Sequence, residues 1–346
     1  MINLLYTPEG WLNFDYIGSR PAWLIIILGA RQVGKTYGCL QYMLKNNIYH
    51  ILLRRTTAEL ETISAAPDLN PYKVFEPDYH TALFKQAKKL CRICDYTTDE
   101  EGKATPTDQR GIATSLAEIA HIRGFNGSAF TDLILDEAIP EKGVITRTTE
   151  GEAFLNAYTT INGNRELSGK MPLRAWLLAN TNRIDSPIME ALGVVDDILY
   201  MRRKHKEEML TKNGVYIVQP LSTVIIKQRT QTAMMKQVSS NSDFYGMAIE
   251  NNFSYDASPY IRNRSIKRMK PVWSYNDEIY CWGDDNSFYI CRAKFKKGGL
   301  SYTGSRTDRK CLCMDWISMK PYYYAGMIQF SDLRALSIFK ILFEIK

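Results

Sequence analysis

The sequence lacks an apolar run long enough to cross a membrane, and its first residues do not have the pattern of a signal peptide. Its seven cysteines lack the spacing of a zinc ribbon, because the C-x-x-C pair at Cys91 and Cys94 lies more than two hundred positions from the C-x-C pair at Cys311 and Cys313. Cys91 and Cys94 also fall in an alternating segment typical of a strand. We therefore expect buried, reduced thiols in a cytosolic protein.

The chain has ample apolar material and an uneven charge. Its 346 residues are 45% hydrophobic and 12% aromatic, which suffices for a large core and suggests two domains. Of 44 basic and 37 acidic side chains, residues 227–346 hold 19 and 11, a net charge of +8, whereas residues 1–226 have −1. This asymmetry favours a polyanionic partner for the C-terminal part, with a well-solvated basic face as the alternative.

The stretch around residues 24–38 carries the clearest chemistry. Leu24–Leu28 is a continuous apolar run that predicts a strand buried on both faces, and Gly29 opens the pattern G-x-x-x-x-G-K-T. Glycines such as Gly34 permit a tight loop whose backbone N–H groups surround phosphate at the start of a helix. Lys35 would then reach the β- and γ-phosphates of a nucleotide, and the Thr36 hydroxyl would ligate Mg²⁺.

Two later strand ends complete a hydrolytic site. Phe130–Glu137 reads as an apolar strand that ends in Asp136, which would hold the Mg²⁺ shell, and Glu137, which would polarise the attacking water. No arginine-rich lid of a small-molecule kinase is evident, so hydrolysis is favoured over transfer. A third strand, Ala175–Ala179, ends in Asn180, which we expect to sense the γ-phosphate or position water. Alternatively, Asn180 caps the turn at 185–187.

Other segments predict the rest of the fold. A strand is expected at Tyr49–Leu53, and two more at Lys89–Tyr96 and Gly111–Leu116, joined by a solvent-exposed acidic loop over Thr97–Gln109. The N-terminal segment offers four aromatic side chains that could pack on the core or flank an adenine base: Tyr6, Trp11, Phe14 and Tyr16.

The chain changes character near residue 200. Alternating charges in 201–214 predict a short exposed helix, so we expect an ATPase domain over 1–199, a linker over 200–227 and a basic domain over 228–346. Within the last domain, Glu278–Gly283 and Ser287–Phe295 predict a hairpin, and Ser331–Lys346 predicts a helix.

The motifs together resemble those of a known family. The segments GARQVGKTYG, HILLRRTTAEL, IRGFNGSAFTDLILDEAIPEKG, INGNRE and WLLANTN are similar, in order and spacing over roughly the first two hundred residues, to the DNA-packaging ATPases of small tailed phages with terminal-protein-capped linear genomes. These are relatives of large terminase subunits, and the similarity includes Arg31 inside the phosphate-binding loop.

The resemblance implies a fold and an activity. We expect an α/β P-loop NTPase with an additional-strand (ASCE), RecA-like parallel sheet, followed by a small α+β domain resembling a reduced RNase H-like nuclease. Such proteins form a ring of about five subunits that docks on a portal in the host cytoplasm and uses ATP and Mg²⁺ to drive double-stranded DNA into a procapsid. A structural packaging RNA is a partner of some relatives.

The resemblance also assigns arginines. Arg123 takes the place of the basic residue of a pore-facing loop, and Arg165 is the one arginine in the segment that supplies the trans-acting finger. From the residues alone, Arg147 and Arg174 compete with Arg165, and a salt bridge is an equal alternative. Arg54 and Arg55 are further candidates for gripping DNA phosphates, although arginines at strand ends often pair with nearby acids.

The basic domain is expected to bind without cutting. A two-metal nuclease needs converging carboxylates, and the central strand SFYICRAKF has none. The carboxylates of this domain fall mostly in turns: Asp256, Asp277, Glu278, Asp284, Asp285, Asp315 and Asp332. Two other classes stay open for the whole chain: a ring helicase or other DNA-translocating ATPase, and a non-catalytic assembly adaptor with a vestigial nucleotide site.

Overall fold

The computed structural model describes residues 4–30, 32–87, 89–119, 127–139, 149–180, 186–220, 224–238, 245, 260–285, 287–303 and 305–343. The chain forms two compact units, one of residues 1–192 with 200–254 and one of residues 193–199 with 255–346. The first unit therefore extends well beyond residue 199, where the sequence predicts the ATPase domain to end.

The first unit is built on a nine-stranded sheet with the order β3-β4-β5-β2-β6-β7-β1-β9-β8. Its strands are β1 (Leu24–Gly29), β2 (His50–Arg54), β3 (Thr81–Ala87), β4 (Leu90–Thr98), β5 (Ala104–Ser115), β6 (Asp132–Asp136), β7 (Arg174–Asn180), β8 (Glu208–Leu210) and β9 (Val215–Val218). The strands from β5 to β9 in this order run parallel, and β3, β4 and β8 add antiparallel pairs at the two edges. Every residue of β1, β6 and β9 is buried, as in a sheet covered on both faces.

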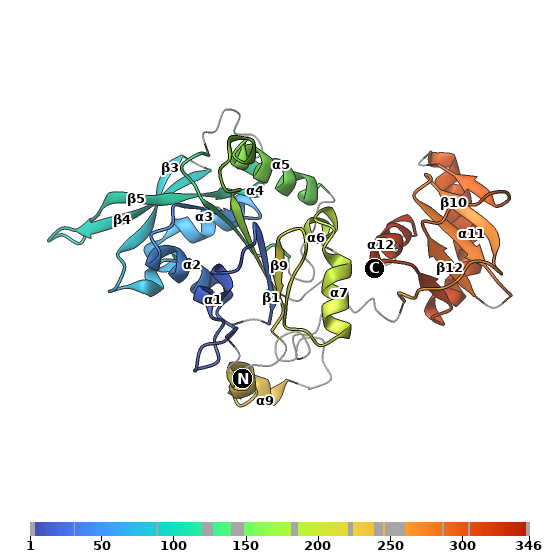
Figure 1. Ribbon diagram of the computed structural model, residues 1–346, viewed down its shortest axis with the longest axis horizontal. Coiled ribbons are helices and arrows are strands. Elements are labelled where there is room, and N and C mark those ends of the chain that lie inside the picture. The colour runs from blue at the N-terminus through green and yellow to red at the C-terminus, as the bar shows by residue number, and fades with distance from the viewer. Residues whose placement is uncertain are drawn as a thin grey trace. The chain divides into compact units, whose positions relative to one another are not determined.

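Helices cover this sheet, and Figure 1 shows α2 and α5 on opposite sides of it. The helices of the first unit are α1 (Phe14–Gly18), α2 (Lys35–Lys45), α3 (Thr57–Ala65), α4 (Leu116–Ile119), α5 (Glu150–Asn162), α6 (Pro187–Ala191), α8 (Val224–Arg229) and α9 (Ala233–Gln237), and α7 (Val195–Arg203) spans the boundary between the units. One core cluster joins alternate residues of β1, such as Ile25 and Ile27, to Phe14 of α1 and Met43 of α2. The strand predictions at the phosphate loop and at the two later strand ends are confirmed.

The hairpin of β4 and β5 is longer than predicted. Residues 104–109 continue β5, so the turn is confined to 99–103, and the paired strands project from the sheet in Figure 1. The side chain of Asp99 closes the turn by accepting from the backbone N–H groups of Glu101 and Lys103, at 3.1 and 2.8 Å. The polar, threonine-rich composition of residues 97–109 predicts a loop, but two strands that form hydrogen bonds to each other can extend into solvent with polar side chains on both faces.

The predicted linker contains two strands of the sheet, β8 and β9, and the exposed helix predicted over 201–214 is wrong except for residues 201–203, which end α7. Val215–Val218 is buried beside β1, and β8 forms the edge of the sheet. The acidic residues of this edge accept hydrogen bonds from N-terminal tyrosines, Glu207 from Tyr6 at 2.5 Å and Glu208 from Tyr16 at 3.1 Å. The alternating charges of this segment therefore belong in part to an edge strand, which hydrogen bonds to the N-terminal tyrosines hold in place.

Burial of the cysteine thiols is confirmed for five of the six that the structure describes, and it is wrong for Cys311. Cys39, Cys91, Cys94, Cys281 and Cys291 are buried free thiols, and Cys311 is exposed. Cys91 and Cys94 lie in β4, as the alternation predicts. Among the described residues, no helix combines the length and apolarity that a membrane span requires.

A buried ion pair at the start of β6 gives a stability prediction. Asp132 is 3% exposed and accepts from Arg174 Nε and from Trp176 Nε1, both at 2.7 Å. The D132A variant would leave the guanidinium without its acid, so we expect the free energy of unfolding to fall by about 3 kcal/mol in chemical denaturation. The exposed pair of Asp15 and Lys45 is the control: D15A should cost less than about 1 kcal/mol. Equal losses for both variants would contradict this account.

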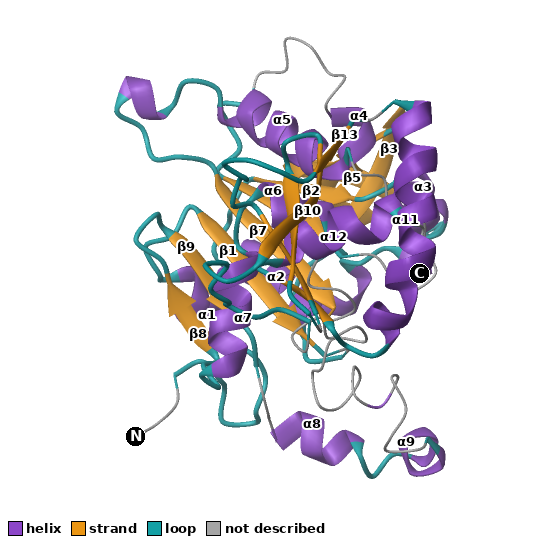
Figure 2. Cartoon of the chain, turned by 90° about the vertical axis from the view of Figure 1, so that its right-hand side faces the viewer, coloured by secondary structure: helices purple, strands orange, loops and turns teal. Residues whose placement is uncertain are grey.

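The second unit has a five-stranded sheet, β13-β10-β11-β12-β14, and in its described residues from 260 onward the helices α11 and α12 accompany this sheet. Its elements are β10 (Lys270–Tyr275), β11 (Ile279–Gly283), β12 (Phe288–Cys291), β13 (Leu300–Tyr302), α11 (Arg306–Tyr324), β14 (Ile328–Phe330) and α12 (Leu333–Leu342), and Figure 2 shows the strands and helices of the chain in separate colours. Aromatic rings join sheet and helix, with Trp273 stacked 6.5 Å from Phe339. The predicted hairpin is confirmed by the antiparallel pairing of β11 with β12, and the predicted final helix by α12.

Candidate active site

The phosphate-binding loop joins the end of β1 to the start of α2. Gly34 is the N-cap of α2 with φ +83°, a left-handed conformation that favours glycine. A Cβ at Gly34 would also lie 3.2 Å from the ring of Trp11. Gly29 is the last residue of β1, one position beyond the predicted strand, and Arg31 lies outside the described residues.

Lys35 is held inside this loop. It is 8% exposed, and its Nζ donates to the carbonyl oxygens of Gly29 and Ala30 at 2.9 and 2.7 Å. Its third partner is Asn180 Oδ1 at 2.9 Å, at the end of β7. Because β7 lies between β1 and β6, the amide reaches the lysine from the neighbouring strand end. The geometry therefore joins Asn180 to the phosphate loop. In the turn at 185–187, residue 185 lies outside the described residues, and Ser186 caps α6 with its own side chain by accepting from the N–H of Met189 at 3.3 Å.

The acidic strand end lies against the same loop. Thr36 Oγ1 donates to Asp136 Oδ1 at 3.0 Å, and the backbone N–H of Glu137 donates to the same oxygen at 3.1 Å. Asp136 is buried, whereas Glu137 is exposed and has φ +58°. This left-handed backbone at the strand end turns the chain sharply between two adjacent carboxylates, so that they occupy different environments.

These residues line one cavity of about 380 Å³. Its wall consists of Gln32, Gly34, Lys35, Thr36, Tyr37, Asp136, Glu137, Leu178, Ala179 and Asn180. One cation, two carboxylates, a hydroxyl, an amide and the start of a helix thus converge on the cavity. They come from the loop after β1 with α2, from the end of β6 and from the end of β7, which together span more than a hundred positions of the sequence. A magnesium nucleotide fits this donor set, because Thr36 and Asp136 offer adjacent oxygens for the metal and Lys35 with the helix start offers positive charge for phosphates.

Arg54 also lies at this site, where it has an acidic partner, the alternative to DNA contact for an arginine at a strand end. Its Nη1 is 2.5 Å from Asp136 Oδ2. Its neighbour Arg55 pairs instead with Glu150 at 3.0 Å and with Glu59 at 3.3 Å. Both arginines therefore have the acidic partners that were the alternative to DNA contact, and contact of either one with DNA stays a prediction.

The candidate finger arginines are placed differently from one another. Arg165 Nη2 donates to the carbonyl oxygen of Gly127 at 2.6 Å and to that of Phe130, before the amino end of β6. The candidate nucleotide-binding residues Asp136 and Glu137 lie at the carboxyl end of that strand, so Arg165 lies at the opposite end of β6 from the candidate site of its own chain. Arg174 is bound to Asp132, and Arg123 and Arg147 lie outside the described residues.

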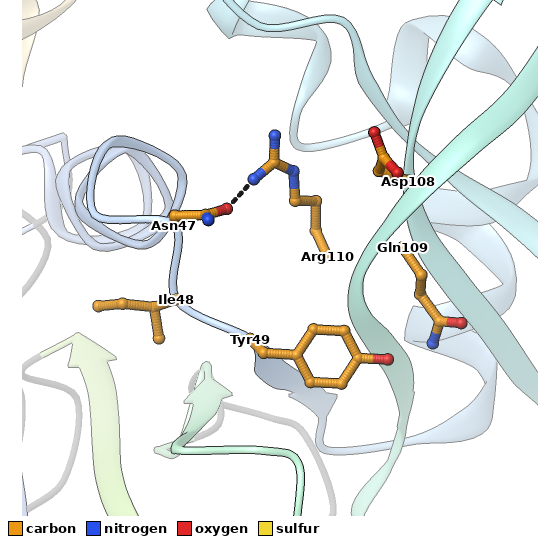
Figure 3. A pocket seen from close by; sticks show the side chains of 6 residues that line it. All are labelled: Asn47, Ile48, Tyr49, Asp108, Gln109 and Arg110. Atoms are coloured by element: carbon orange, nitrogen blue, oxygen red, sulfur yellow. Dashed lines mark hydrogen bonds between the residues drawn. The ribbon is translucent and has the colours of Figure 1, made fainter.

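A second, open cavity of about 490 Å³ lies where β2 begins. Figure 3 shows its lining, Asn47, Ile48, Tyr49, Asp108, Gln109 and Arg110, with Arg110 donating to Asn47. Arg110 also pairs with Asp95 of β4 at 2.5 Å. The cationic group of this cavity is therefore already neutralised by the hairpin.

Three of the four N-terminal aromatic residues pack in or against the core, and adenine contact by Trp11 stays a prediction. Phe14 is 6% exposed in the core, and Tyr6 and Tyr16 are bound to β8 and the residue before it. Trp11 is 42% exposed and lies beside Gly34. Of these four residues, Trp11 is therefore the one best placed to contact an adenine base.

Comparisons with known proteins agree with this architecture. No protein-family model matches the chain. The chain is 26% identical over 271 residues to a DNA packaging protein of Bacillus phage B103, a similarity that covers 76% of this chain and 72% of that protein. In fold it is similar to a chain of the bacteriophage Phi-29 viral genome packaging motor assembly, with a TM-score of 0.65, 21% identity and coverage of 96% and 98% of the two chains. The Phi-28 gp11 DNA packaging motor is similar with a TM-score of 0.56, 15% identity and 99% coverage of each chain. The chain is thus similar in sequence to a phage DNA packaging protein and shares the fold of phage packaging motors, as its motifs predict.

Proposed function

We propose that this protein is the ATPase of a viral DNA-packaging motor, which couples ATP hydrolysis to the movement of double-stranded DNA into a procapsid. The observation that carries the proposal is the convergence of Lys35, Thr36, Asp136, Glu137 and Asn180 on one cavity. The similarity to a phage DNA packaging protein gives that hydrolytic site its biological setting.

The chain's own residues divide the chemistry of hydrolysis. Lys35 and the backbone N–H groups at the start of α2 bind the phosphates and oppose the charge that develops on them. Glu137, exposed to the cavity, orients the attacking water and accepts its proton. Asn180 contacts Lys35 and so is placed to respond to the γ-phosphate without adding charge. When bound, Mg²⁺ would be held by Thr36 and Asp136 and would neutralise charge on the phosphates.

The additional-strand core favours a ring in which neighbours complete each site. The position of β7 between β1 and β6 is the arrangement such a core requires. Arg165 lies away from its own cavity and in an exposed loop after α5, which suits a finger that acts on a neighbouring subunit. A pentameric ring on a portal, a packaging RNA and DNA contact through Arg123 are parts of the same proposal.

The second unit is proposed to be a reduced, RNase H-like domain that binds without cutting. Several of its carboxylates have their own partners: Asp277 accepts from Tyr280 at 2.8 Å, and Asp284 pairs with Arg264 at 2.9 Å. Asp332 accepts from the N–H of Ala335 at 2.9 Å, at the start of α12. We therefore expect linear DNA to stay intact with this protein and Mn²⁺, and metal-dependent cleavage would contradict the assignment.

The proposal is tested by DNA packaging itself. Purified protein, portal-bearing procapsids, duplex DNA and ATP are combined, and DNA that has become resistant to nuclease is measured. ATP-dependent protection is expected, with none when a non-hydrolysable analogue replaces ATP. A forked DNA substrate in the same buffer tests the helicase alternative, because strand separation without protection would favour that reading over packaging.

A further inference from the structure

The carboxylate that would bind the metal, that of Asp136, already forms an ion pair with an arginine. β2 and β6 are parallel neighbours with Leu53 opposite Leu135, so the next residues, Arg54 and Asp136, meet where both strands end. Arg54 Nη1 lies 2.5 Å from Asp136 Oδ2, and the two side chains are 15% and 9% exposed. This is therefore a largely buried, charge-assisted contact inside the proposed nucleotide site.

The two oxygens of Asp136 have separate tasks. Oδ1 accepts from Thr36 Oγ1 and from the N–H of Glu137, which fixes the carboxylate against the phosphate loop. Oδ2 faces Arg54. A buried carboxylate without a positive partner is unfavourable, so the guanidinium provides the compensating charge in the protein alone.

A divalent metal cannot bind to Asp136 while Arg54 keeps its present position. Thr36 and Asp136 are 3.0 Å apart, so a cation bound between their oxygens would lie close to the guanidinium that already contacts Asp136. Two positive groups at this spacing repel each other in a partly buried site. Arg54 Nε is also buried and without a hydrogen-bond partner in the described part of the chain, so the guanidinium retains an unused donor.

We infer that Arg54 is an internal counter-ion of the magnesium site, which neutralises Asp136 until a magnesium nucleotide displaces it. The inference rests on the proposed function, because it concerns the same site. Its consequence is an order of binding: the metal enters together with phosphate, whose negative charge offsets the second cation and offers the released guanidinium an acceptor. Arg54 is thus a positioning residue for Asp136 rather than a contact for DNA.

The test measures the requirement for metal, not turnover. A fluorescent ADP analogue at saturating concentration is titrated with Mg²⁺ in the wild-type, R54Q and R55Q proteins. Removing the competing cation should lower the half-saturating Mg²⁺ concentration of R54Q by about tenfold. R55Q is the matched control, because Arg55 follows the same strand but pairs with Glu59 and Glu150, and its Mg²⁺ requirement should equal that of wild type.

The outcomes separate the inference from the proposed function. An R54Q protein that needs as much Mg²⁺ as wild type, or more, would overturn the counter-ion role, whereas a wild-type protein that binds no nucleotide would refute the proposed function instead. R54K retains the charge and covers the case in which R54Q folds poorly. It should need a Mg²⁺ concentration near that of wild type, and a reduced requirement equal to that of R54Q would also overturn the inference.

Thermal unfolding supplies a second readout. Without metal and nucleotide, R54Q should melt below wild type because Asp136 has lost its partner. Adding Mg²⁺ and ADP should then raise the melting temperature of R54Q more than that of wild type, since the metal replaces the missing charge. An equal gain in both proteins would count against the inference.

Discussion

The K35A variant is expected to hydrolyse ATP at least about a hundredfold more slowly than wild type. Lys35 is buried, and its ammonium group is held by Gly29, Ala30 and Asn180, each through an oxygen within 2.9 Å. Alanine would remove the positive charge that faces the phosphates and leave those three oxygens without their donor. Phosphate release from ATP, with and without duplex DNA, measures the effect.

A lysine of the same helix serves as the control. Lys45 ends α2 and forms an exposed pair with Asp15, with side-chain exposures of 57% and 60%. The K45A variant should therefore retain the hydrolysis rate of wild type. If K35A kept that rate as well, the loop of residues 29–36 would not be the phosphate site.

The E137Q variant is expected to bind ATP but to hydrolyse it about a hundredfold to ten-thousandfold more slowly. Glutamine has nearly the same shape as glutamate, so the cavity and its phosphate-binding groups stay intact. It cannot accept a proton from water, and the charge that activates the nucleophile is lost. Binding of a fluorescent ATP analogue, measured beside single-turnover hydrolysis, separates these two steps.

The matched control is E101Q, because Glu101 is an exposed residue in the turn between β4 and β5. It should resemble wild type in both binding and hydrolysis. Loss of ATP binding in E137Q would mean that Glu137 supports the fold of the site, and undiminished hydrolysis would mean that another group activates water.

Most residues of the candidate site can be predicted from the sequence, because they lie in a glycine pattern or at the ends of apolar strands. Lys35 and Thr36 follow a buried strand within a glycine pattern, and Asp136 and Glu137 end a second apolar strand. In a parallel sheet such ends share one edge, so their convergence follows from local pattern and handedness. Asn180 is found by the same argument, and the structure places it 2.9 Å from Lys35.

The contacts that cannot be predicted from the sequence are those that depend on which strands become neighbours in the sheet. Arg54 meets Asp136 because β2 lies beside β6, and residues 82 positions apart give no local sign of that pairing. The sequence likewise gives no local sign of β8, because Glu208 and the preceding Glu207 accept hydrogen bonds from tyrosines of the distant N-terminal segment. Strand order and long-range side-chain partners are tertiary properties, which override charge patterning and local propensity.

The most direct test is a structure of the protein with Mg²⁺ and a non-hydrolysable ATP analogue. The account predicts a triphosphate wrapped by residues 29–36, a metal between Thr36 and Asp136, and Glu137 facing the γ-phosphate. An analogue bound elsewhere, or a cavity that stays empty at saturating nucleotide, would contradict it.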